Sequence, residues 1–290
     1  MDLNDLLRAK TIEPEQVLVF RHSPREPQLK KVLPWLAAEK QELFNAYQQS
    51  QGATLEKVMA DGKARYVASF IGLAPGTASF VGLYSIAGSS RLSYEQYWTV
   101  PANVELKRLG MAGLEDSRPN CLWFNLLLMD VYSSWKGKLI VVWPPPERSW
   151  WRWAYRNEMA VHAILEESQF DGAMPKWNEI ELGWEELRAM PERWRAKLRE
   201  WRGVYYIFDC TDRKGYVGSA YGEENLLGRW LEYAASGHGD NALLKERDPR
   251  NFRFSILQRV SPDMDAADVI HLEGTWKERL HARTHGLCAN

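Results

Sequence analysis

Two short apolar segments joined by a polar turn constrain the fold of this chain more than any other feature. In the first segment, 203–208, apolar side chains alternate as in a strand with one face against a core. A polar turn occupies 209–214. The second segment, 216–218, reads Tyr-Val-Gly and ends in a glycine, where side-chain bulk would be unwelcome. The pattern predicts an antiparallel hairpin.

A helix, a strand and a second helix are predicted after the hairpin. Apolar residues recur at helical spacing in 223–235, and Arg229 lies beside that apolar stripe. Residues 251–258 alternate as a strand, and 265–282 have a helical pattern again. Glu273 lies on the edge of the apolar stripe of this second helix, where a carboxylate can face a cleft.

The ordered series Tyr205, Tyr216, Arg229 and Glu273 resembles the catalytic core of the GIY-YIG nuclease family, in the order and near the spacing of that family. The resemblance covers residues 203–290. It implies a small antiparallel sheet flanked by helices, the GIY-YIG fold. It also implies an enzyme that hydrolyses DNA phosphodiesters with one Mg²⁺ or Mn²⁺ ion. It further implies that Tyr205 is the general base, Tyr216 its hydrogen-bonded neighbour, and Glu273 the sole protein ligand of the metal.

These residue types suit that chemistry. A carboxylate such as Glu273 suits a hard ion like Mg²⁺, which keeps most of its waters and takes only one or two protein carboxylates. Arg229 offers planar, permanently charged donors to a phosphate as negative charge grows in the transition state. Because the reference pKa of tyrosine is about 10, Tyr205 needs the metal and Arg229 to favour its phenolate.

The resemblance points to two further residues. His238 falls where some members of the family place a histidine near the scissile phosphate, and Asn290 could match a late asparagine. A structural role stays open for each of these candidates, because a strand tyrosine is commonly a core residue and a helix Arg or Glu commonly lies at the surface. A zinc site at His281, His285 and Cys288 is a further alternative, although it lacks an evident fourth ligand.

Length, charge and cysteine content bound the class of protein. A chain of 290 residues with 45% hydrophobic content can bury more core than the nuclease segment uses, so at least one more domain is implied. The net charge of −1 gives no global basic signal, so nucleic-acid contacts have to come from local patches. Three separated cysteines favour reduced thiols. With no targeting or membrane-spanning segment apparent, we expect a soluble, cytoplasmic protein that binds no membrane.

Residues 1–158 are predicted to form a β-rich, barrel-like domain. The expected strands are 17–20, 65–73, 77–86, 94–100 and 139–143, and one helix is expected at 28–49. The segments 67–72 and 78–84 resemble strands of PUA-like barrels, including the EVE group, whose members bind RNA or modified DNA bases in an aromatic pocket. A generic small barrel is the alternative. The rings that could wall a pocket are Tyr66, Phe70, Phe80, Tyr84, Trp98 and Trp143.

Arginines alternate with aromatic rings near the end of this first domain. Rings there can stack on bases while the arginines contact phosphates, or they can pin the segment onto the β core with the arginines solvated. The residues concerned are Arg148, Trp150, Arg152 and Trp153.

Residues 159–202 are interpreted as a helical, basic connector, with helices at 159–167 and 184–202 and a strand at 177–182. The second helix could follow a DNA backbone or could simply be a solvated helix face. Its candidate contacts are Arg193, Arg195, Lys197 and Arg199.

The sequence therefore favours an α+β protein with a recognition domain at 1–158, a connector at 159–202 and a nuclease domain at 203–290. We expect a metal-dependent endonuclease acting on double-stranded DNA. Restriction of foreign or base-modified DNA is its expected setting, with the first domain selecting the substrate. Homing or repair incision is the alternative within the class. A nucleic-acid-binding protein with RNA as ligand is the alternative outside it. An oligomer is one way in which both DNA strands could be cut.

Overall fold

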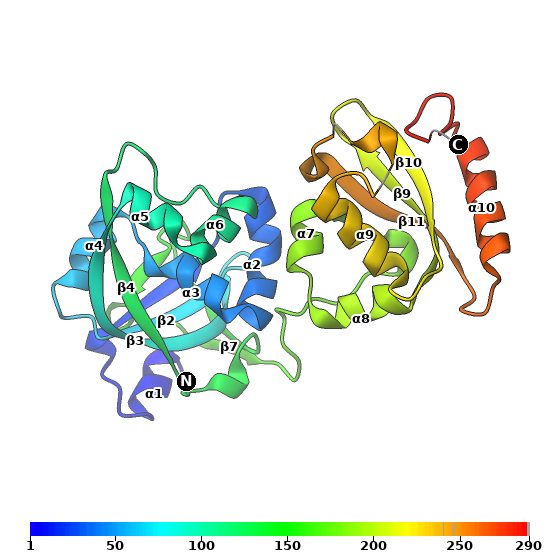
Figure 1. The fold of residues 1–290 in the computed structure, drawn as a ribbon. Coiled ribbons are helices and arrows are strands. Elements are labelled where there is room, and N and C mark those ends of the chain that lie inside the picture. The colour runs from blue at the N-terminus through cyan, green and yellow to red at the C-terminus, as the bar shows by residue number, and fades with distance from the viewer. Residues whose placement is uncertain (240, 246, 289–290) are drawn as a thin grey trace. The chain divides into compact units, whose positions relative to one another are not determined.

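The computed structural model describes residues 1–239, 241–245 and 247–288. The chain divides into two compact units, Met1–Gly172 (unit 1) and Ala173–Asn290 (unit 2), each of mixed α and β structure (Figure 1). The division falls inside the segment 159–202 that we expected to be a connector, so each unit takes part of that segment. No helix in the described part of the chain is long and apolar enough to cross a membrane.

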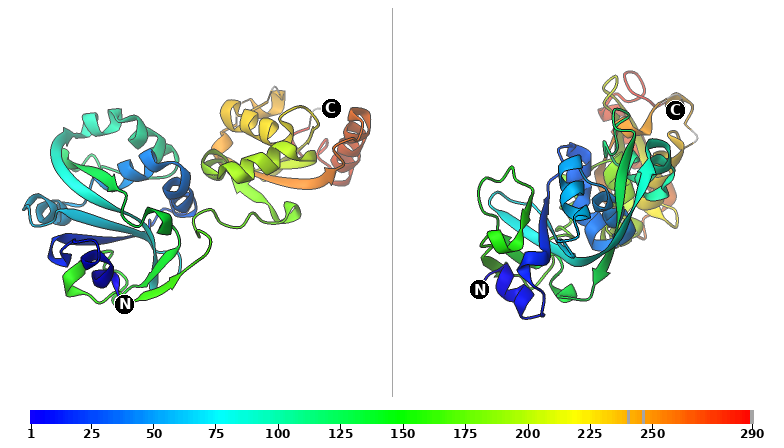
Figure 2. Two further views of the ribbon diagram at one scale, coloured as in Figure 1. Left: turned by 90° about the horizontal axis from the view of Figure 1, so that it is seen from below. Right: turned by 90° about the vertical axis from the view of Figure 1, so that its left-hand side faces the viewer.

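Unit 1 is built on a seven-stranded sheet with the order β6-β1-β2-β3-β5-β7, in which β4 also pairs with β3. The strands β1 and β2 are parallel, and β3 pairs antiparallel with β2, β4 and β5. Register shifts in the β2–β3 and β3–β4 pairs bend the long β3, so the sheet curls into half a barrel (Figures 1 and 2). The strands are β1 Val17–His22, β2 Tyr66–Ile71, β3 Thr77–Ser93, β4 Asn120–Met129, β5 Leu139–Val142, β6 Trp151–Trp153 and β7 Val161–Ile164.

Both faces of strand β1 are buried. In β1, Val17 and Val19 belong to one hydrophobic cluster, while Leu18 and Phe20 belong to another on the opposite face. The helices of unit 1 are α1 Leu3–Arg8, α2 Pro27–Glu39, α3 Gln41–Gln49, α4 Ala53–Ala60, α5 Tyr94–Thr99 and α6 Pro101–Arg108. Its short 3₁₀ turns are η1 Pro14–Gln16, η2 Ser133–Trp135 and η3 Ala154–Arg156.

Three expectations for unit 1 need correction. The strand predicted at 94–100 is wrong, because Ser93 and Gln96 form a capping box that starts helix α5. The helix predicted at 159–167 is also wrong, since Val161–Ile164 pairs with β5 as strand β7. The helix predicted at 28–49 is divided into α2 and α3, because the backbone leaves the helical conformation at Lys40.

Unit 2 contains a four-stranded sheet with the order β10-β9-β11-β8. The predicted hairpin is confirmed as β9 Arg202–Asp209 and β10 Lys214–Ala220, which pair antiparallel. The predicted third strand is β11 Phe252–Val260, and the two predicted helices are α9 Asn225–Ser236 and α10 Ala266–Arg279. Figure 1 shows α9 and α10 on opposite sides of this sheet. Two short 3₁₀ turns, η5 Ala242–Leu244 and η6 Pro249–Asn251, precede β11.

The segment before β9 is part of this unit. Strand β8, Glu181–Gly183, follows the turn η4 Trp177–Glu179 and pairs with β11, so only the end of the strand predicted at 177–182 is a strand. The single helix predicted at 184–202 consists of α7 Trp184–Ala189 and α8 Glu192–Glu200. They are separated at Pro191, which has an extended backbone and fits the start of a helix better than its interior.

Candidate active site

Strand β9 carries Tyr205, whose side chain is fully buried. Two residues earlier, Gly203 has a φ of +153°, which is accessible to glycine but not to residues with a side chain. A Cβ at this position would overlap the carbonyl oxygen of Gln258 in β11. The first glycine of the motif therefore allows β9 and β11 to pair closely and sets the position of Tyr205 in the sheet.

Gly218 on β10 has a role similar to that of Gly203, because it also leaves space for close packing. It lies opposite Tyr205 in the strand register, and a Cβ there would lie 2.5 Å from Tyr205 Oη and 2.9 Å from Tyr216 Cε1. Tyr216 and Gly218 share one face of β10, because alternate residues of a strand point to the same side. The missing side chain at Gly218 therefore leaves the space into which the phenol ring of Tyr205 extends.

Three tyrosine rings meet on this face of the sheet. The ring centroids of Tyr205 and Tyr216 are 6.4 Å apart, and that of Tyr233 on α9 lies 6.2 Å from the first and 5.6 Å from the second. Tyr233 is fully buried and is a residue that our reading of the sequence missed. Its position four residues after Arg229, on the same helix face, is the signal that could have identified it.

Arg229 reaches this cluster from α9. Its Nη2 donates to Tyr233 Oη at 3.3 Å, and its guanidinium carbon lies 5.4 Å from the centroid of that ring. Its Nη1 pairs with Glu232 Oε2 at 2.6 Å, and the side chain stays 37% exposed. Arg229 is thus fixed beside the tyrosines while part of its guanidinium remains open to a ligand.

The Tyr205 hydroxyl is the unsatisfied group of the cluster. Its Oη is shielded from solvent and, within the described residues, completes no hydrogen bond of normal geometry. Burial, followed by the neighbouring Tyr216, raises the pKa of Tyr205 above its ordinary value, while the charge of Arg229 and the polar contacts with Tyr233 and Arg229 act in the opposite direction. The folded chain by itself therefore favours the neutral phenol.

Glu273 lies on α10 and is held by two neighbours. Its Oε2 accepts a hydrogen bond from the Ser219 hydroxyl, and its Oε1 pairs with Lys277 Nζ at 2.7 Å. The Glu273 side chain is 16% exposed. Within the described part of the chain, no three His, Cys, Asp or Glu side chains are grouped so that they could hold a metal ion, and this includes His281, His285 and Cys288.

Glu273 and Arg229 are on helices at opposite sides of the sheet (Figure 1). Burial, the neighbouring Tyr233 and the Glu273 carboxylate raise the pKa of Tyr216, so the carboxylate lies close enough to act on that phenol. Among the described residues, no hydrogen bond or ion pair joins Glu273 to Tyr205 or Arg229. The structure therefore brings the tyrosines and the arginine together and places the carboxylate across strand β10.

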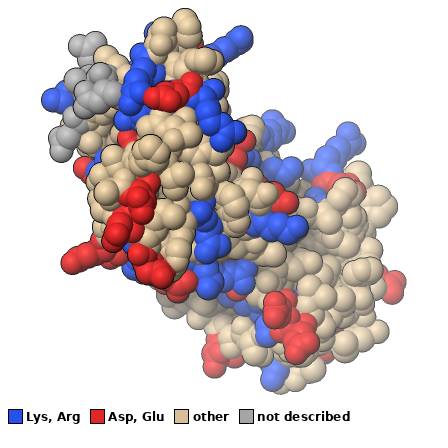
Figure 3. Space-filling view, turned by 90° about the vertical axis from the view of Figure 1, so that its right-hand side faces the viewer, with Lys and Arg blue, Asp and Glu red and all other residues tan. Residues whose placement is uncertain are grey.

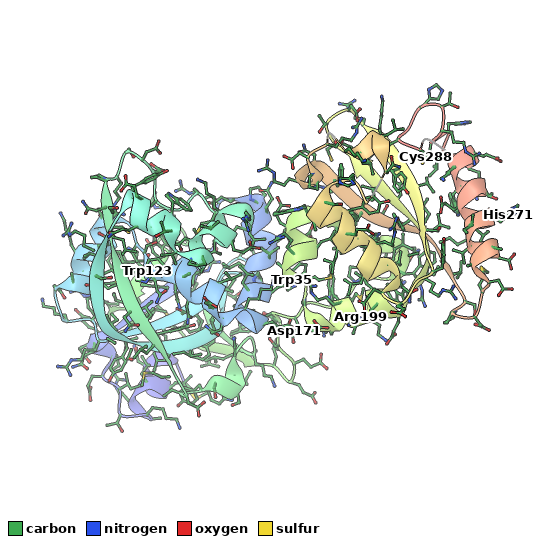
Figure 4. All side chains as sticks on the ribbon, in the orientation of Figure 1. Trp35, Trp123, Asp171, Arg199, His271 and Cys288 are labelled. Carbon is green, nitrogen blue, oxygen red and sulfur yellow. The ribbon has the colours of Figure 1, made fainter. Side chains whose placement is uncertain are left out.

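The C-terminal segment covers part of the free edge of β10. The Leu287 amide donates to the Gly215 carbonyl at 2.8 Å, and the Val217 amide donates to Cys288 Sγ at 3.3 Å. Cys288 lies beside the sheet, whereas His271 on α10 points away from it (Figure 4). Asn290, predicted to belong to the site, lies outside the described residues.

His238 follows the end of α9. Gly237 caps that helix in the left-handed conformation, and the His238 amide donates to Ser236 Oγ at 3.2 Å. The His238 side chain is half-buried. The role of His238 near a scissile phosphate stays a prediction.

The four candidate nucleic-acid contacts of unit 1 have different surroundings. The Arg152 guanidinium donates to the carbonyls of Pro144 and Pro146 at 2.9 and 3.1 Å, and it lies 5.6 Å from the Trp143 ring. Trp153 packs against a hydrophobic cluster of the sheet. The remaining two candidates, Arg148 and Trp150, line a cavity.

The candidate contacts on α8 are largely engaged within the protein. Arg195 donates to the carbonyls of Leu187, Arg188 and Met190. Lys197 pairs with Glu200, and Arg199 pairs with Glu192 and Glu224. Arg193 also has an interaction partner. Basic and acidic side chains are interspersed on the face drawn in Figure 3. Contact of these four with DNA stays a prediction.

No protein-family model and no curated protein matches the chain. Among solved structures, a mutant form of the catalytic domain of intron endonuclease I-TevI is similar to part of it, at 21% sequence identity and a TM-score of 0.27, covering 31% of this chain and 94% of that one. The catalytic domain of homing endonuclease I-TevI is also similar, at 25% identity and a TM-score of 0.26, covering 30% of this chain and 95% of that one. TM-scores this low do not establish a shared fold.

Proposed function

We propose that unit 2 is a nuclease of the GIY-YIG type that hydrolyses phosphodiester bonds of double-stranded DNA. The observation that carries this proposal is the buried Tyr205 hydroxyl, which lies among Tyr216, Tyr233 and Arg229 and, within the described residues, completes no hydrogen bond of normal geometry. Leaving a buried polar group unsatisfied costs about 1–3 kcal/mol. Such a cost is explained at a site where a substrate group or a water molecule completes the bond.

In this proposal the chain supplies a general base, Tyr205, a cation that binds the phosphate, Arg229, and a residue that holds this cation in place, Tyr233. Tyr205 Oη orients the attacking water and, as the phenolate, accepts its proton to become the neutral phenol. Arg229 binds an oxygen of the scissile phosphate, where its preorganised donors stabilise the charge that develops in the transition state. It also favours the phenolate form of Tyr205 and so opposes the effect of burial on the pKa of that phenol. Tyr233 accepts a hydrogen bond from Arg229 and so fixes the guanidinium.

Glu273 is the residue that would hold the single Mg²⁺ or Mn²⁺ ion. Its carboxylate fits a hard ion, because it is an oxygen donor with some solvent exposure and one oxygen is held by a cation, Lys277, that a divalent ion can replace. Ser219 keeps the other oxygen oriented. When bound, the ion supplies Lewis-acid stabilisation of the phosphate and activation of water.

The edge strand β10 is where the substrate has to lie. Arg229 and Glu273 reach the sheet from opposite sides, so a phosphate that contacts both passes this edge. The part from Gly215 to Val217 is covered by the C-terminal segment. The end of β10 that carries Ser219 is therefore the proposed place of cleavage.

The proposed biological setting is restriction of foreign or base-modified DNA, with unit 1 selecting the substrate. A catalytic unit this small has little surface for reading base edges, and phosphate contacts alone carry no sequence information. Unit 1 contains a large cavity that can supply this selection.

Replacement of Glu273 tests the proposal. Glu273→Ala should abolish cleavage of a plasmid in Mg²⁺ while the melting temperature and most of the DNA affinity are retained, because the change removes the proposed metal ligand. Glu278→Ala is the matched control, since Glu278 lies on the same helix, is 74% exposed and pairs only at the surface with Arg283. Cleavage by Glu273→Ala at about a tenth of the wild-type rate or more, or cleavage in the presence of a chelator, would contradict the assignment.

A further inference from the structure

Unit 1 contains a cavity of about 800 Å³. It lies where the end of β1 meets the end of α3, the segment 111–118 after α6, and the loop that precedes β6. Cavities of roughly 300–1,000 Å³ are typical of small-molecule and cofactor sites. The cavity therefore has room for a ligand, and the chemistry of its lining shows which kind.

The lining contains four arginines, of which two are engaged within the protein. Arg21 pairs with Glu147 at 3.1 Å, and Arg118 pairs with Glu56 at 2.5 Å. The other two, Arg25 and Arg148, are exposed and have no hydrogen-bond or ion-pair partner among the described residues. They come from different loops, one after β1 and one before β6. Two free guanidinium groups at one cavity suit an anion with several oxygens, of which phosphate is the common biological example.

An exposed indole ring lies beside these cations. The Trp150 side chain is 37% exposed, although its position is fixed by the Arg21 amide, which donates to the Trp150 carbonyl at 2.7 Å. Phe20 packs against the ring with a centroid distance of 5.6 Å. A ring that is held in place and still exposed is suited to stacking against a planar ligand.

Apart from Arg21, which is paired with Glu147, the buried part of the lining is uncharged. Burial lowers the pKa of His22 to about 4, so this side chain is a neutral imidazole at physiological pH. Its Nε2 lies 3.4 Å from Gln48 Oε1, so the ring and this amide are within hydrogen-bonding distance. Tyr47 packs on that imidazole with ring centroids 5.2 Å apart, and burial raises the pKa of its phenol, which therefore stays a hydrogen-bond donor. A neutral, aromatic interior next to exposed cations fits a molecule that is planar at one end and anionic at the other.

We propose that this cavity binds a nucleotide unit, with the base beside Trp150 and Tyr47 and the phosphate on Arg25 and Arg148. The unit is supplied either by a DNA strand from which one base is turned out of the stack or by a free nucleotide. Extraction of a base costs a few kcal/mol, and stacking together with the two charged contacts offsets that cost. The proposal deepens the proposed function by naming what unit 1 selects, but it rests on the cavity alone.

Binding to the full chain in the Glu273→Gln background, with a chelator present, tests this proposal without any cleavage. The first set of probes is dCMP, deoxyribose 5-phosphate and inorganic phosphate, measured by calorimetry. We expect dCMP to bind tenfold or more tighter than deoxyribose phosphate, equivalent to about 1.4 kcal/mol. The second set is duplexes that differ in one modified or unpaired cytosine. Tenfold preference for such a duplex assigns the site to DNA, and tight dCMP binding without that preference assigns it to a free nucleotide.

Variants connect the binding to the named residues. Trp150→Ala should weaken dCMP binding tenfold or more and leave phosphate binding within about twofold, whereas Trp150→Phe keeps a ring and should retain most of the affinity. The double variant Arg25→Gln/Arg148→Gln should weaken binding of both probes. Tyr155→Ala and Arg8→Gln/Arg108→Gln are the matched controls, since these exposed residues of unit 1 do not line the cavity.

The proposal is overturned if deoxyribose phosphate binds as tightly as dCMP, if no probe binds, or if Trp150→Ala binds dCMP as the parent protein does. A Trp150→Ala protein that fails to fold leaves Trp150→Phe and the arginine pair to decide. None of these outcomes depends on nuclease activity, so failure of the cavity proposal and failure of the proposed function are distinguishable.

Discussion

Gly218→Ala tests the tyrosine cluster directly. A Cβ at this position would lie 2.5 Å from Oη and 2.6 Å from Cζ of Tyr205, and 2.9 Å from Cε1 of Tyr216. Non-bonded carbon atoms are normally separated by about 3.5–4.0 Å. Because Tyr205 is fully buried, its ring cannot turn into solvent to make room. The strand pair, the ring or both have to shift.

The expected cost follows from that overlap. Forcing an extra carbon into a well-packed core costs about 1–3 kcal/mol. For a domain of this size, such a loss lowers the melting temperature by roughly 4–12 °C. Cleavage should fall as well, because the shift moves the Tyr205 hydroxyl away from Arg229.

Thermal unfolding followed by circular dichroism and calorimetry measures the effect on unit 2. Two matched controls are available, since a Cβ at Gly222 or at Gly274 would meet no atom within 4 Å. Gly222→Ala should leave the melting temperature unchanged, and Gly274→Ala, inside α10, should raise stability by up to about 1 kcal/mol. Addition of Tyr205→Phe to Gly218→Ala removes the nearest atom but not Cζ, so it should restore only part of the loss. If Gly218→Ala melts within about a degree of Gly222→Ala, the described packing of the tyrosines is wrong.

Three further predictions follow from the same structure. Arg229→Lys should lower the single-turnover cleavage rate by about 10²–10³, because lysine lacks the planar donors, and an unchanged rate would make Arg229 a surface residue. Lys277→Met removes the cation 2.7 Å from Glu273 and should tighten Mn²⁺ binding severalfold by electron paramagnetic resonance, whereas weaker binding would oppose a metal at Glu273. Burial lowers the pKa of His22 to about 4, so between about pH 6.5 and 4 the unfolded chain binds a proton that the folded chain does not. The free energy of unfolding of unit 1 should therefore fall by roughly 3 kcal/mol as the pH drops through this range. Denaturant titrations should find this acid loss reduced in His22→Gln.

The sequence by itself determined the hairpin of unit 2 and the spacing of its motif. Alternation over Val204–Phe208 is visible in the sequence, and the two motif glycines mark the places where a side chain would overlap Gln258 or Tyr205. Periodicity is local information, and local information is sufficient where one strand pairs with the next along the chain. The helices α9 and α10 were predicted for the same reason.

Two errors in unit 1 have different causes. The start of α5 is encoded locally by Ser93 and Gln96, so a capping signal at the end of an apolar run was overlooked. Strand β7 has no such local signal. Its four residues are held by pairing with β5, and β6 and η3 lie between the two strands in the sequence. Tertiary pairing decided that element.

Only the tertiary structure decided which aromatic residues line the cavity of unit 1. Phe70, Phe80 and Trp143, predicted to wall a pocket, belong to one hydrophobic core, and Tyr84 belongs to another. Both faces of β1 and β2 are buried, so apolar residues do not alternate with polar ones along these strands. Without that alternation the sequence does not show which residues face a cavity. Trp150 lies at the cavity because its loop is held against β1 by a backbone hydrogen bond from the Arg21 amide. Arg21 is more than a hundred positions earlier in the sequence, so this contact exists only in the folded chain.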